Sequence, residues 1–384
     1  MVDDMSSGQT GARCATSATC MNQQTSITSQ ASGEQVAAKK YSIIKLGLDV
    51  HAAFIMVVMQ IENSHPKPAQ KFTAAKFPDW VRKLLDQAER VVSCYEAGPT
   101  GYWLHRQLMA LGVENIVVCP TKLDSRGKGV NTDKTDALEL LVRLDRYVAG
   151  NLQSFSVVRV PTVEQEQSRA QTRQREQLRK HRLSLASQGR TAMLLQGLRY
   201  SNHWWKSACW PTLQKQLPPA LLMQLEIYHR LILEVQKEIE QLTGQIRQGA
   251  VAPQPKGLGQ LTSQVIDREV VQWDRFKNWR QAGSYSGLTG GVSASGESSA
   301  DLSITKTGNP RLRTALIEAS WRLLMFQPEY WLVKKWRAVL LNPKVHARRR
   351  KQAIVAFARQ LMVDLWRWKS GRITPEELGW RMTD

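Results

Sequence analysis

The sequence predicts an α/β domain, then long helices, then a mostly helical C-terminal domain. Three observations lead to this expectation. Short apolar runs alternate with helical segments between Tyr41 and Tyr147, the middle of the chain is polar, basic and helical, and an apolar repeat follows Pro219. A chain of 384 residues, 42% of them hydrophobic, is long enough for two domains with buried cores.

The first segment, residues 1–40, is rich in Ser, Thr, Gln and Gly and has almost no large apolar residues. Such a composition does not offset the entropy of ordering, so we expect a disordered tail. The α/β domain is expected over residues 41–150. It begins with apolar strands at 42–49 and 53–61 and a third strand near Lys71.

Helices and strands then alternate within the same domain. The expected elements are a helix at 79–88, a strand at 90–95, a helix at 100–111, a strand at 114–119 and a closing helix at 132–147. Three strands followed by alternating helix and strand is the order of a ribonuclease H-like domain, although other α/β folds begin similarly.

A helical connector is expected over residues 151–250, and a C-terminal domain over 251–384. The segment from Val163 to Leu198 is polar and basic, and the next long helix carries apolar residues at alternating steps of four and three, the spacing of a coiled coil. These residues are Leu221, Leu225, Tyr228, Ile232, Val235, Ile239, Leu242 and Ile246. The two long helices are expected to form either an antiparallel hairpin or a dimer contact.

The formal charge of +20 and the sequence pI near 10.0 indicate a polyanionic partner, DNA or RNA. The most apolar stretch, Ile43 to Met59, is interrupted by Lys45, Asp49 and His51, so no membrane span is expected. Five scattered cysteines without a C-x-x-C pair suggest neither a disulfide framework nor a zinc site. A cytoplasmic, nucleoid-associated protein fits these features.

Basic residues in four regions are natural phosphate contacts, although a solvated helix face explains each helical run equally well. Binding through them would fall steeply with salt. The candidates are Lys134, Arg169, Arg173, Arg179, Lys306, Arg311, Arg313, Arg348, Arg349 and Arg350.

Four acids form a candidate metal site. Asp49 ends the first strand and Glu96 ends the fourth, and side chains at neighbouring strand ends converge on one edge of a sheet. Asp133 and Asp136 lie three residues apart at a helix start and face the same way. Taken singly, each acid also fits a turn or cap. Together they would repel one another unless a cation such as Mg²⁺ bound between them.

The segment 284–299 is dense in Gly and Ser and is predicted to be a flexible loop. Basic residues follow it between Thr305 and Arg313. A serine that attacks phosphorus needs exposure, nearby positive charge and an activating base or metal. An ordinary linker is the more frequent explanation of such a composition, and the residues do not choose among four serines: Ser293, Ser295, Ser298 and Ser299.

At these residues the sequence resembles the DEDD-type insertion-sequence transposases, which are bridge-RNA-guided serine recombinases. The likeness extends from about Leu46 to Ser370. The matching segments are Gly47-Leu-Asp-Val-His51, Tyr95-Glu-Ala-Gly-Pro-Thr-Gly-Tyr102, Thr132-Asp-Lys-Thr-Asp-Ala137, Gly287-Leu-Thr289, Ser295-Gly296 and Lys306-Thr-Gly-Asn-Pro-Arg-Leu-Arg313.

The resemblance implies a RuvC-like N-terminal domain whose metal ligands are Asp49, Glu96, Asp133 and Asp136. It implies a coiled-coil connector and a C-terminal domain in which Ser295 forms a transient phosphoserine link to DNA. The resemblance further implies a homo-oligomer, a dimer or tetramer, that shares a composite site between subunits. It also implies that a structured guide RNA selects donor and target DNA.

The expected protein is therefore a Mg²⁺-dependent recombinase that cuts and rejoins DNA under RNA guidance. Two alternatives stay open. One is a RuvC-like nuclease that uses water as its nucleophile, and the other is a non-catalytic nucleic-acid-binding protein.

Overall fold

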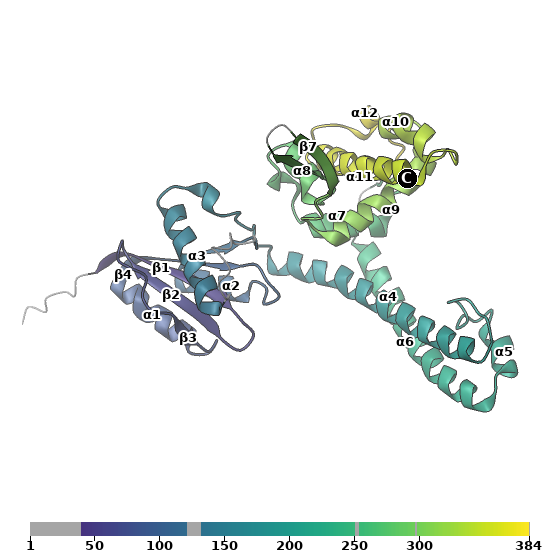
Figure 1. Ribbon diagram of the computed structural model, residues 1–384, viewed down its shortest axis with the longest axis horizontal. Coiled ribbons are helices and arrows are strands. Elements are labelled where there is room, and N and C mark those ends of the chain that lie inside the picture. The colour runs from purple at the N-terminus through teal and green to yellow at the C-terminus, as the bar shows by residue number, and fades with distance from the viewer. Residues whose placement is uncertain (1–39, 121–131, 250–252, 296–297, 384) are drawn as a thin grey trace, which may run out of the picture. The chain divides into compact units, whose positions relative to one another are not determined.

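The computed structural model describes residues 40–120, 132–249, 253–295 and 298–383. The tail expected to be disordered lies, apart from Lys40, outside the described residues. The chain divides into two compact units between Arg159 and Val160. The N-terminal unit is built on a mixed β-sheet and the C-terminal unit is mostly helical, so the expected combination of an α/β part and an α part is confirmed (Figure 1).

A five-stranded sheet forms the centre of the N-terminal unit, with the order β3-β2-β1-β4-β5. Strand β1 pairs antiparallel with β2 and parallel with β4, while β2–β3 pairs antiparallel and β4–β5 parallel. Buried aliphatic residues dominate β1, β2 and β4, which explains why these apolar runs become strands. The strands are β1 (Tyr41–Val50), β2 (Ile55–Ile61), β3 (Gln70–Phe72), β4 (Ala88–Glu96) and β5 (Glu114–Val118).

Three helices complete this unit in the predicted order: α1 (Phe77–Gln87), α2 (Trp103–Leu111) and α3 (Asp133–Val148), followed by the short η1 (Leu152–Ser154). Helix α3 packs on β1 and β2 through apolar residues at helical spacing, including Leu141 and Leu144, which are fully buried. Thr132 caps this helix in a capping box with Thr135, which fixes where α3 begins.

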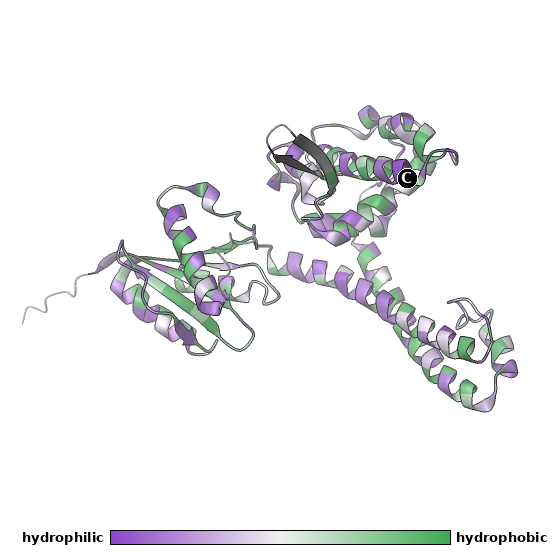
Figure 2. Ribbon diagram, viewed as in Figure 1, coloured by the Kyte–Doolittle hydropathy of each residue, from purple (hydrophilic) through white to green (hydrophobic). Residues whose placement is uncertain are grey.

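Two long helices, α4 (Val163–Leu195) and α6 (Pro219–Gln248), pack side by side in the C-terminal unit. Their contacts run in opposite directions along the chain, from Arg175 against Thr243 to Arg182 against Gln236, so the pair is antiparallel. The apolar repeat of α6 faces this contact, and five of its eight members are buried: Leu221, Leu225, Ile232, Ile239 and Ile246. Figure 2 shows α6 rich in hydrophobic residues and the first half of α4 mostly hydrophilic.

A tryptophan-rich turn, which includes α5 (Trp210–Leu213) and η2 (Gln214–Gln216), joins the far ends of α4 and α6. The Trp204 indole is fully buried and donates a hydrogen bond to the Ala186 carbonyl at 2.8 Å. It lies directly over Gly189, where a Cβ would come within 2.3 Å of the ring. Trp210 stacks on His229 with ring centroids 4.2 Å apart. These contacts fix the turn to both helices.

The rest of the C-terminal unit packs around the central helix α11 (Ala347–Lys369). No helix among the described residues is long and apolar enough to cross a membrane. The surrounding elements are α7 (Gln260–Val270), η3 (Trp273–Arg275), α8 (Trp279–Tyr285), β6 (Gly290–Ser295), β7 (Ser298–Ile304), α9 (Pro310–Phe326), α10 (Trp331–Leu340) and α12 (Pro375–Leu378).

The prediction of a flexible loop at 284–299 is wrong. The segment instead begins with the end of α8 and then contains β6. Strand β6 forms an antiparallel hairpin with β7, in which Ser295 pairs with Ser298. Glycine and serine are poor strand formers, but the pairing satisfies backbone N–H and C=O groups whatever the side chains are. The partner strand continues to Ile304, beyond the Ser/Gly composition that suggested a loop.

Candidate active site

Two of the predicted acids, Asp49 and Glu96, stand at the carboxyl ends of adjacent parallel strands. Leu48 of β1 is paired with Tyr95 of β4, so the two acids occupy the next positions along the same two strands. Leu48 and Tyr95 are fully buried. Because successive side chains alternate between faces, Asp49 and Glu96 belong to the opposite face of the sheet.

That opposite face is the one that α3 covers, and Gly47 sets how closely the helix approaches. A Cβ at Gly47 would lie 2.2 Å from the Ala137 carbonyl oxygen and 2.5 Å from the Leu141 amide nitrogen. No side chain fits there. On β4 the Cys94 thiol, which lies on the same face, donates to the Leu140 carbonyl at 3.4 Å. This close packing brings the first turn of α3 to the end of β1.

The first turn of α3 carries Asp133, and His51 lies between it and Asp49. His51 Nε2 is 2.9 Å from Asp49 Oδ2 and 3.5 Å from Asp133 Oδ1. One potential ligand atom from each of the three residues lies within 4.8 Å of the other two. Their side chains are 24% (Asp49), 40% (His51) and 45% (Asp133) exposed, so solvent and ligands reach them.

Glu96 and Asp136 border this trio. Burial and the charges of Asp136 and Asp49 raise the pKa of the Glu96 carboxyl, and the opposing effect of Arg143 does not cancel them. Burial and neighbouring carboxylates, Asp49 first and Asp133 among them, raise the pKa of Asp136. The structure therefore places the four predicted carboxylates at one end of the sheet, where the charges of Asp49 and Asp136 act on Glu96. Of the four, only Asp49 and Asp133 belong to the group whose ligand atoms lie within 4.8 Å of one another.

The donor chemistry of this cluster fits a divalent cation. Carboxylate oxygens are the ligands of hard cations, and a cation would offset the burial and the carboxylate repulsion that raise the pKa of Glu96 and Asp136. His51 was not singled out as a ligand from the sequence. The available signal was its place two residues after Asp49 in Gly47-Leu-Asp-Val-His51, which puts both side chains on the same side of the strand end.

Ser295 is the last residue of β6, at the end of the hairpin where it pairs with Ser298. The structure describes its backbone, while its side chain lies outside the described part. At the base of the hairpin, Thr305 and Lys306 donate backbone hydrogen bonds to the carbonyls of Thr289 and Gly287, at 2.9 and 3.2 Å. The predicted basic segment therefore continues directly from β7.

At the base of the hairpin, the chain that leaves β7 passes against the end of α8, and two glycines make this close approach possible. A Cβ at Gly308 would lie 2.6 Å from the Tyr285 carbonyl oxygen and 2.7 Å from the Gly287 amide nitrogen. Gly287 itself has a φ of +68°, a backbone conformation that residues with a side chain rarely adopt. Only glycine at these two positions lets the chain segment after β7 pass so close to the end of α8.

Asn309, which follows Gly308, connects the base of the hairpin to α7 and α9. Its Oδ1 accepts hydrogen bonds from the amides of Arg311 and Leu312, which caps α9, and its Nδ2 donates to Glu269 at 2.6 Å. Glu269 of α7 is 1% exposed and also accepts two hydrogen bonds from Arg173 of α4. These three side chains tie α4, α7 and α9 together, and sequence reasoning did not find Glu269 or Asn309 because their partners are distant in the chain.

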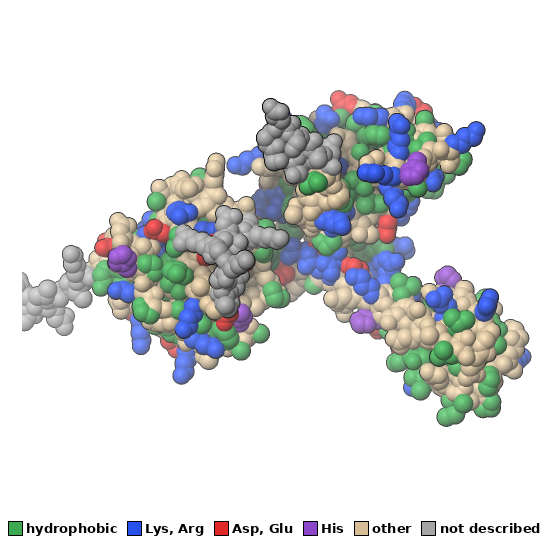
Figure 3. Space-filling model, in the orientation of Figure 1, with side chains coloured by type: hydrophobic (Ala, Val, Ile, Leu, Met, Phe, Trp, Pro, Cys, Tyr) green, Lys and Arg blue, Asp and Glu red, His purple; other side chains and the backbone are tan. Residues whose placement is uncertain are grey.

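Some of the predicted phosphate contacts have internal partners. Besides Arg173, Arg311 forms an ion pair with Glu176 at 2.5 Å, and Arg313 donates to the carbonyls of Ser286 and Lys306. Arg169 and Arg350 are half-buried, and the exposed candidates are Lys134, Arg179, Lys306, Arg348 and Arg349. On the face shown in Figure 3, basic side chains outnumber acidic ones on the C-terminal unit.

The C-terminal unit contains a transposase domain. Residues 253–333 match the Transposase IS116/IS110/IS902 family. The matched segment runs from α7 through the hairpin to the first turn of α10, and therefore includes Glu269, Ser295 and Asn309.

Similar proteins include two from Sinorhizobium fredii, strain NBRC 101917 / NGR234, that are named transposase. The y4rJ protein is 29% identical over 332 residues, covering 79% of this chain and 83% of its own length. The y4qE protein is 34% identical over 250 residues, covering 63% of this chain and 60% of its own. The transposase for insertion sequence element IS1533 of Leptospira borgpetersenii is 32% identical over 140 residues, covering 35% of this chain and 39% of its own length.

Proposed function

We propose that this protein is an insertion-sequence transposase that cuts and rejoins DNA. The observation that carries the proposal is the group of Asp49, His51 and Asp133, bordered by Glu96 and Asp136, in a chain that also contains a transposase domain. We assign the N-terminal unit to the RuvC-like group. The sheet order, with three antiparallel strands followed by two parallel ones, supports this assignment.

The carboxylate cluster would hold Mg²⁺ through Asp49 and Asp133, which lie beside His51, with Glu96 and Asp136 at its border. When bound, Mg²⁺ supplies positive charge that activates an attacking oxygen and stabilises a leaving one at phosphorus. His51 orients Asp49 through the contact of 2.9 Å. Glu96, whose pKa is raised, holds a proton more readily than an ordinary carboxyl does when no cation is present.

Ser295 would be the nucleophile. Its Oγ forms a bond to phosphorus, the bond from phosphorus to one strand oxygen breaks, and the hydroxyl proton is transferred to that leaving oxygen. Rejoining reverses these steps with a new strand end. The position of Ser295 at the end of the hairpin, and the exposed Lys306 at the base, support this role.

The carboxylates and Ser295 belong to different units of the chain. The family resemblance implies a homo-oligomer, a dimer or tetramer, in which one subunit's carboxylates work with another's serine. It also implies that a structured guide RNA selects donor and target DNA. The formal charge of +20 supports partners of this kind, because two nucleic acids would be bound at once.

Covalent trapping tests the serine. The protein, purified with its copurifying RNA, is incubated with Mg²⁺ and DNA that carries the element's ends, and then denatured. The expected result is a protease-sensitive protein–DNA adduct from the wild type and none from Ser295→Ala. Ser293→Ala and Ser299→Ala are the matched controls and should retain the adduct. Cleavage by Ser295→Ala would instead support the nuclease that uses water.

The metal site needs its own variants. Asp49→Asn and Glu96→Gln should abolish cleavage and adduct formation in Mg²⁺ while leaving DNA binding in place. Unchanged DNA products from both variants would reject the carboxylate mechanism. A wild type that binds DNA and never alters it would favour the non-catalytic alternative.

A further inference from the structure

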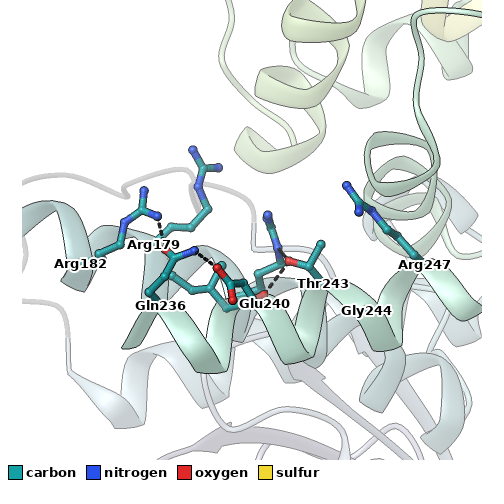
Figure 4. Close-up of a pocket in the computed structure, with 9 residues that line it drawn as sticks. Arg179, Arg182, Gln236, Glu240, Thr243, Gly244 and Arg247 are labelled. Atoms are coloured by element: carbon teal, nitrogen blue, oxygen red, sulfur yellow. Dashed lines mark hydrogen bonds between the residues drawn. The ribbon is translucent and has the colours of Figure 1, made fainter. Parts of the chain in front are cut away.

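A concave site with a volume of about 410 Å³ lies between α4 and α6, away from the serine hairpin in the sequence. Three arginines of α4, at steps of four and three residues, share the helix face that lines it: Arg175, Arg179 and Arg182. Arg247 of α6 lines it from the other side. Figure 4 shows the labelled guanidinium groups of Arg179, Arg182 and Arg247 around the opening above α6.

Neutral acceptors hold two of these arginines in place. Arg175 Nε donates to Thr243 Oγ1 at 2.6 Å, and Arg182 donates to Gln236 Oε1 at 2.5 Å. Among the described residues that line the site, Glu240 is the only acid, and its carboxylate accepts a hydrogen bond from the Gln236 amide at 2.6 Å. Four positive charges therefore face one negative charge.

No ion pair with a carboxylate engages any of the four arginines among the residues that the structure describes. Burial, followed by repulsion from Arg179, Arg247 and Arg182, lowers the pKa of Arg175. Burial and Arg179 lower the pKa of Arg182. Arginine stays charged in spite of such shifts, so the folded chain retains a concentration of unneutralised positive charge at this place.

We propose that the four arginines form a binding site for a phosphate group of a nucleic-acid backbone. Guanidinium groups match phosphate oxygens in a bidentate geometry, and several of them around one anion exchange mutual repulsion for attraction. The volume is that of a small-ligand site, which accommodates a phosphate with part of its nucleotide. The choice of a nucleic acid rests on the proposed function, whereas the anion preference follows from the charges alone.

The site is part of the connector and not of the candidate active site, so it would contribute affinity and register without chemistry. RNA and DNA offer the same phosphodiester group. The helices themselves do not distinguish the two, and the experiment has separate arms for them.

The test compares Arg175→Gln/Arg179→Gln with Arg190→Gln, an exposed arginine on the same helix outside the site. Fluorescence anisotropy measures binding of a labelled single-stranded RNA, and of DNA of the same sequence, over a range of salt. The double variant should lose about tenfold or more in affinity, as expected for charge-assisted hydrogen bonds, and its salt slope should fall by about one. Arg190→Gln should change neither quantity.

Loss with RNA alone assigns the site to an RNA backbone, loss with DNA alone to a DNA backbone, and equal loss to both. Thermal unfolding at constant ionic strength provides a second readout, in which inorganic phosphate should stabilise the wild type more than the double variant. Equal affinities and salt slopes for the double variant and Arg190→Gln would overturn the proposal, even if inorganic phosphate binds. Neither assay involves cleavage, so an inactive transposase site would leave this result unaffected.

Discussion

Arg173 of α4 holds the buried carboxylate of Glu269 of α7 through two hydrogen bonds, from Nε at 3.0 Å and from Nη2 at 2.8 Å. Burial alone would raise the pKa of Glu269, but the hydrogen bonds from Arg173 and Asn309 outweigh it and hold the pKa below its ordinary value. Arg173, a basic residue of the long connector, is thus bound to the transposase domain through Glu269. The same carboxylate accepts from Asn309 at the start of α9, the helix that follows the serine hairpin.

The first prediction concerns the pH dependence of this pair. Because the pKa of Glu269 is lowered on folding, its contribution to stability is present above the ordinary value of 4.5 and is lost as the pH falls through the lowered value. Glu269→Gln should therefore reduce the loss of unfolding free energy between neutral and acidic pH. At neutral pH it should cost about 2 kcal/mol, less than a fully buried pair, because Arg173 is 37% exposed.

Urea denaturation at several pH values measures this effect. Glu329→Gln is the matched control, since Glu329 pairs with Lys334 on the surface and removal of such a pair changes stability little. A Glu269→Gln protein with the wild-type stability at neutral pH and the wild-type acid profile would show that the ion pair does not fasten the helices.

The second prediction concerns Gly47. In Gly47→Ala the new Cβ would collide with the backbone of α3 at Ala137 and Leu141, so the helix must move away from β1. We expect a loss of about 3 kcal/mol in unfolding free energy. Asp133 moves with the helix, and the stabilisation of the protein by Mg²⁺ should fall as well.

Gly244→Ala is the control for the same substitution in the opposite setting. Gly244 is inside α6, and a Cβ added there would meet no described atom within 4 Å, so alanine should stabilise the helix by about 0.5–1 kcal/mol. Thermal and chemical denaturation distinguish the two signs. Wild-type stability and Mg²⁺ response in Gly47→Ala would mean that α3 does not need the close approach.

The carboxylates could be predicted from the sequence because their positions follow from local patterns. Apolar runs end at Asp49 and Glu96, and the β-strand repeat then decides which face they occupy. Asp133 follows a threonine cap at the start of a helix. Short-range regularities of this kind depend on neighbouring residues alone, and therefore the order of elements in the N-terminal unit was predicted closely.

The roles of individual basic residues could not be predicted in the same way. Arg173 and Arg179 are alike in the sequence, yet Arg173 is engaged by Glu269, 96 residues away, while Arg179 is exposed and lines the α4–α6 site. The hairpin at Ser295 was missed for a related reason. Its partner strand extends beyond the Ser/Gly segment, and backbone pairing overrode a composition typical of loops.

The third prediction concerns the protein without a cation. The pKa of Glu96 is raised on folding, so its favourable contribution is complete below the ordinary value of 4.5 and is lost as the pH rises through the raised value. At neutral pH the carboxylates repel one another. Glu96→Gln should therefore raise the Tm of the protein in chelator at neutral pH, and it should diminish the increase that Mg²⁺ produces in the wild type.

Thermal unfolding in chelator and in Mg²⁺ measures both effects. Glu89→Gln, at the other end of β4 on an exposed position, is the matched variant and should behave like the wild type in both buffers. A lower Tm of Glu96→Gln in chelator, together with a full response to Mg²⁺, would place Glu96 outside the cation site.

The fourth prediction concerns the base of the serine hairpin. In Gly308→Ala the new Cβ would meet the Tyr285 carbonyl oxygen and the Gly287 amide, so the strand leaving β7 must shift against α8. Overpacking of this kind costs about 1–3 kcal/mol, which the surrounding helical core can tolerate. The yield of covalent adduct should fall by more than DNA binding does, because the shift displaces the hairpin that carries Ser295. Gly290→Ala, whose new Cβ would meet no described atom within 4 Å, is the control and should retain both adduct formation and DNA binding. A folded Gly308→Ala protein with full adduct yield would show that the close approach of Gly308 to Gly287 does not position Ser295.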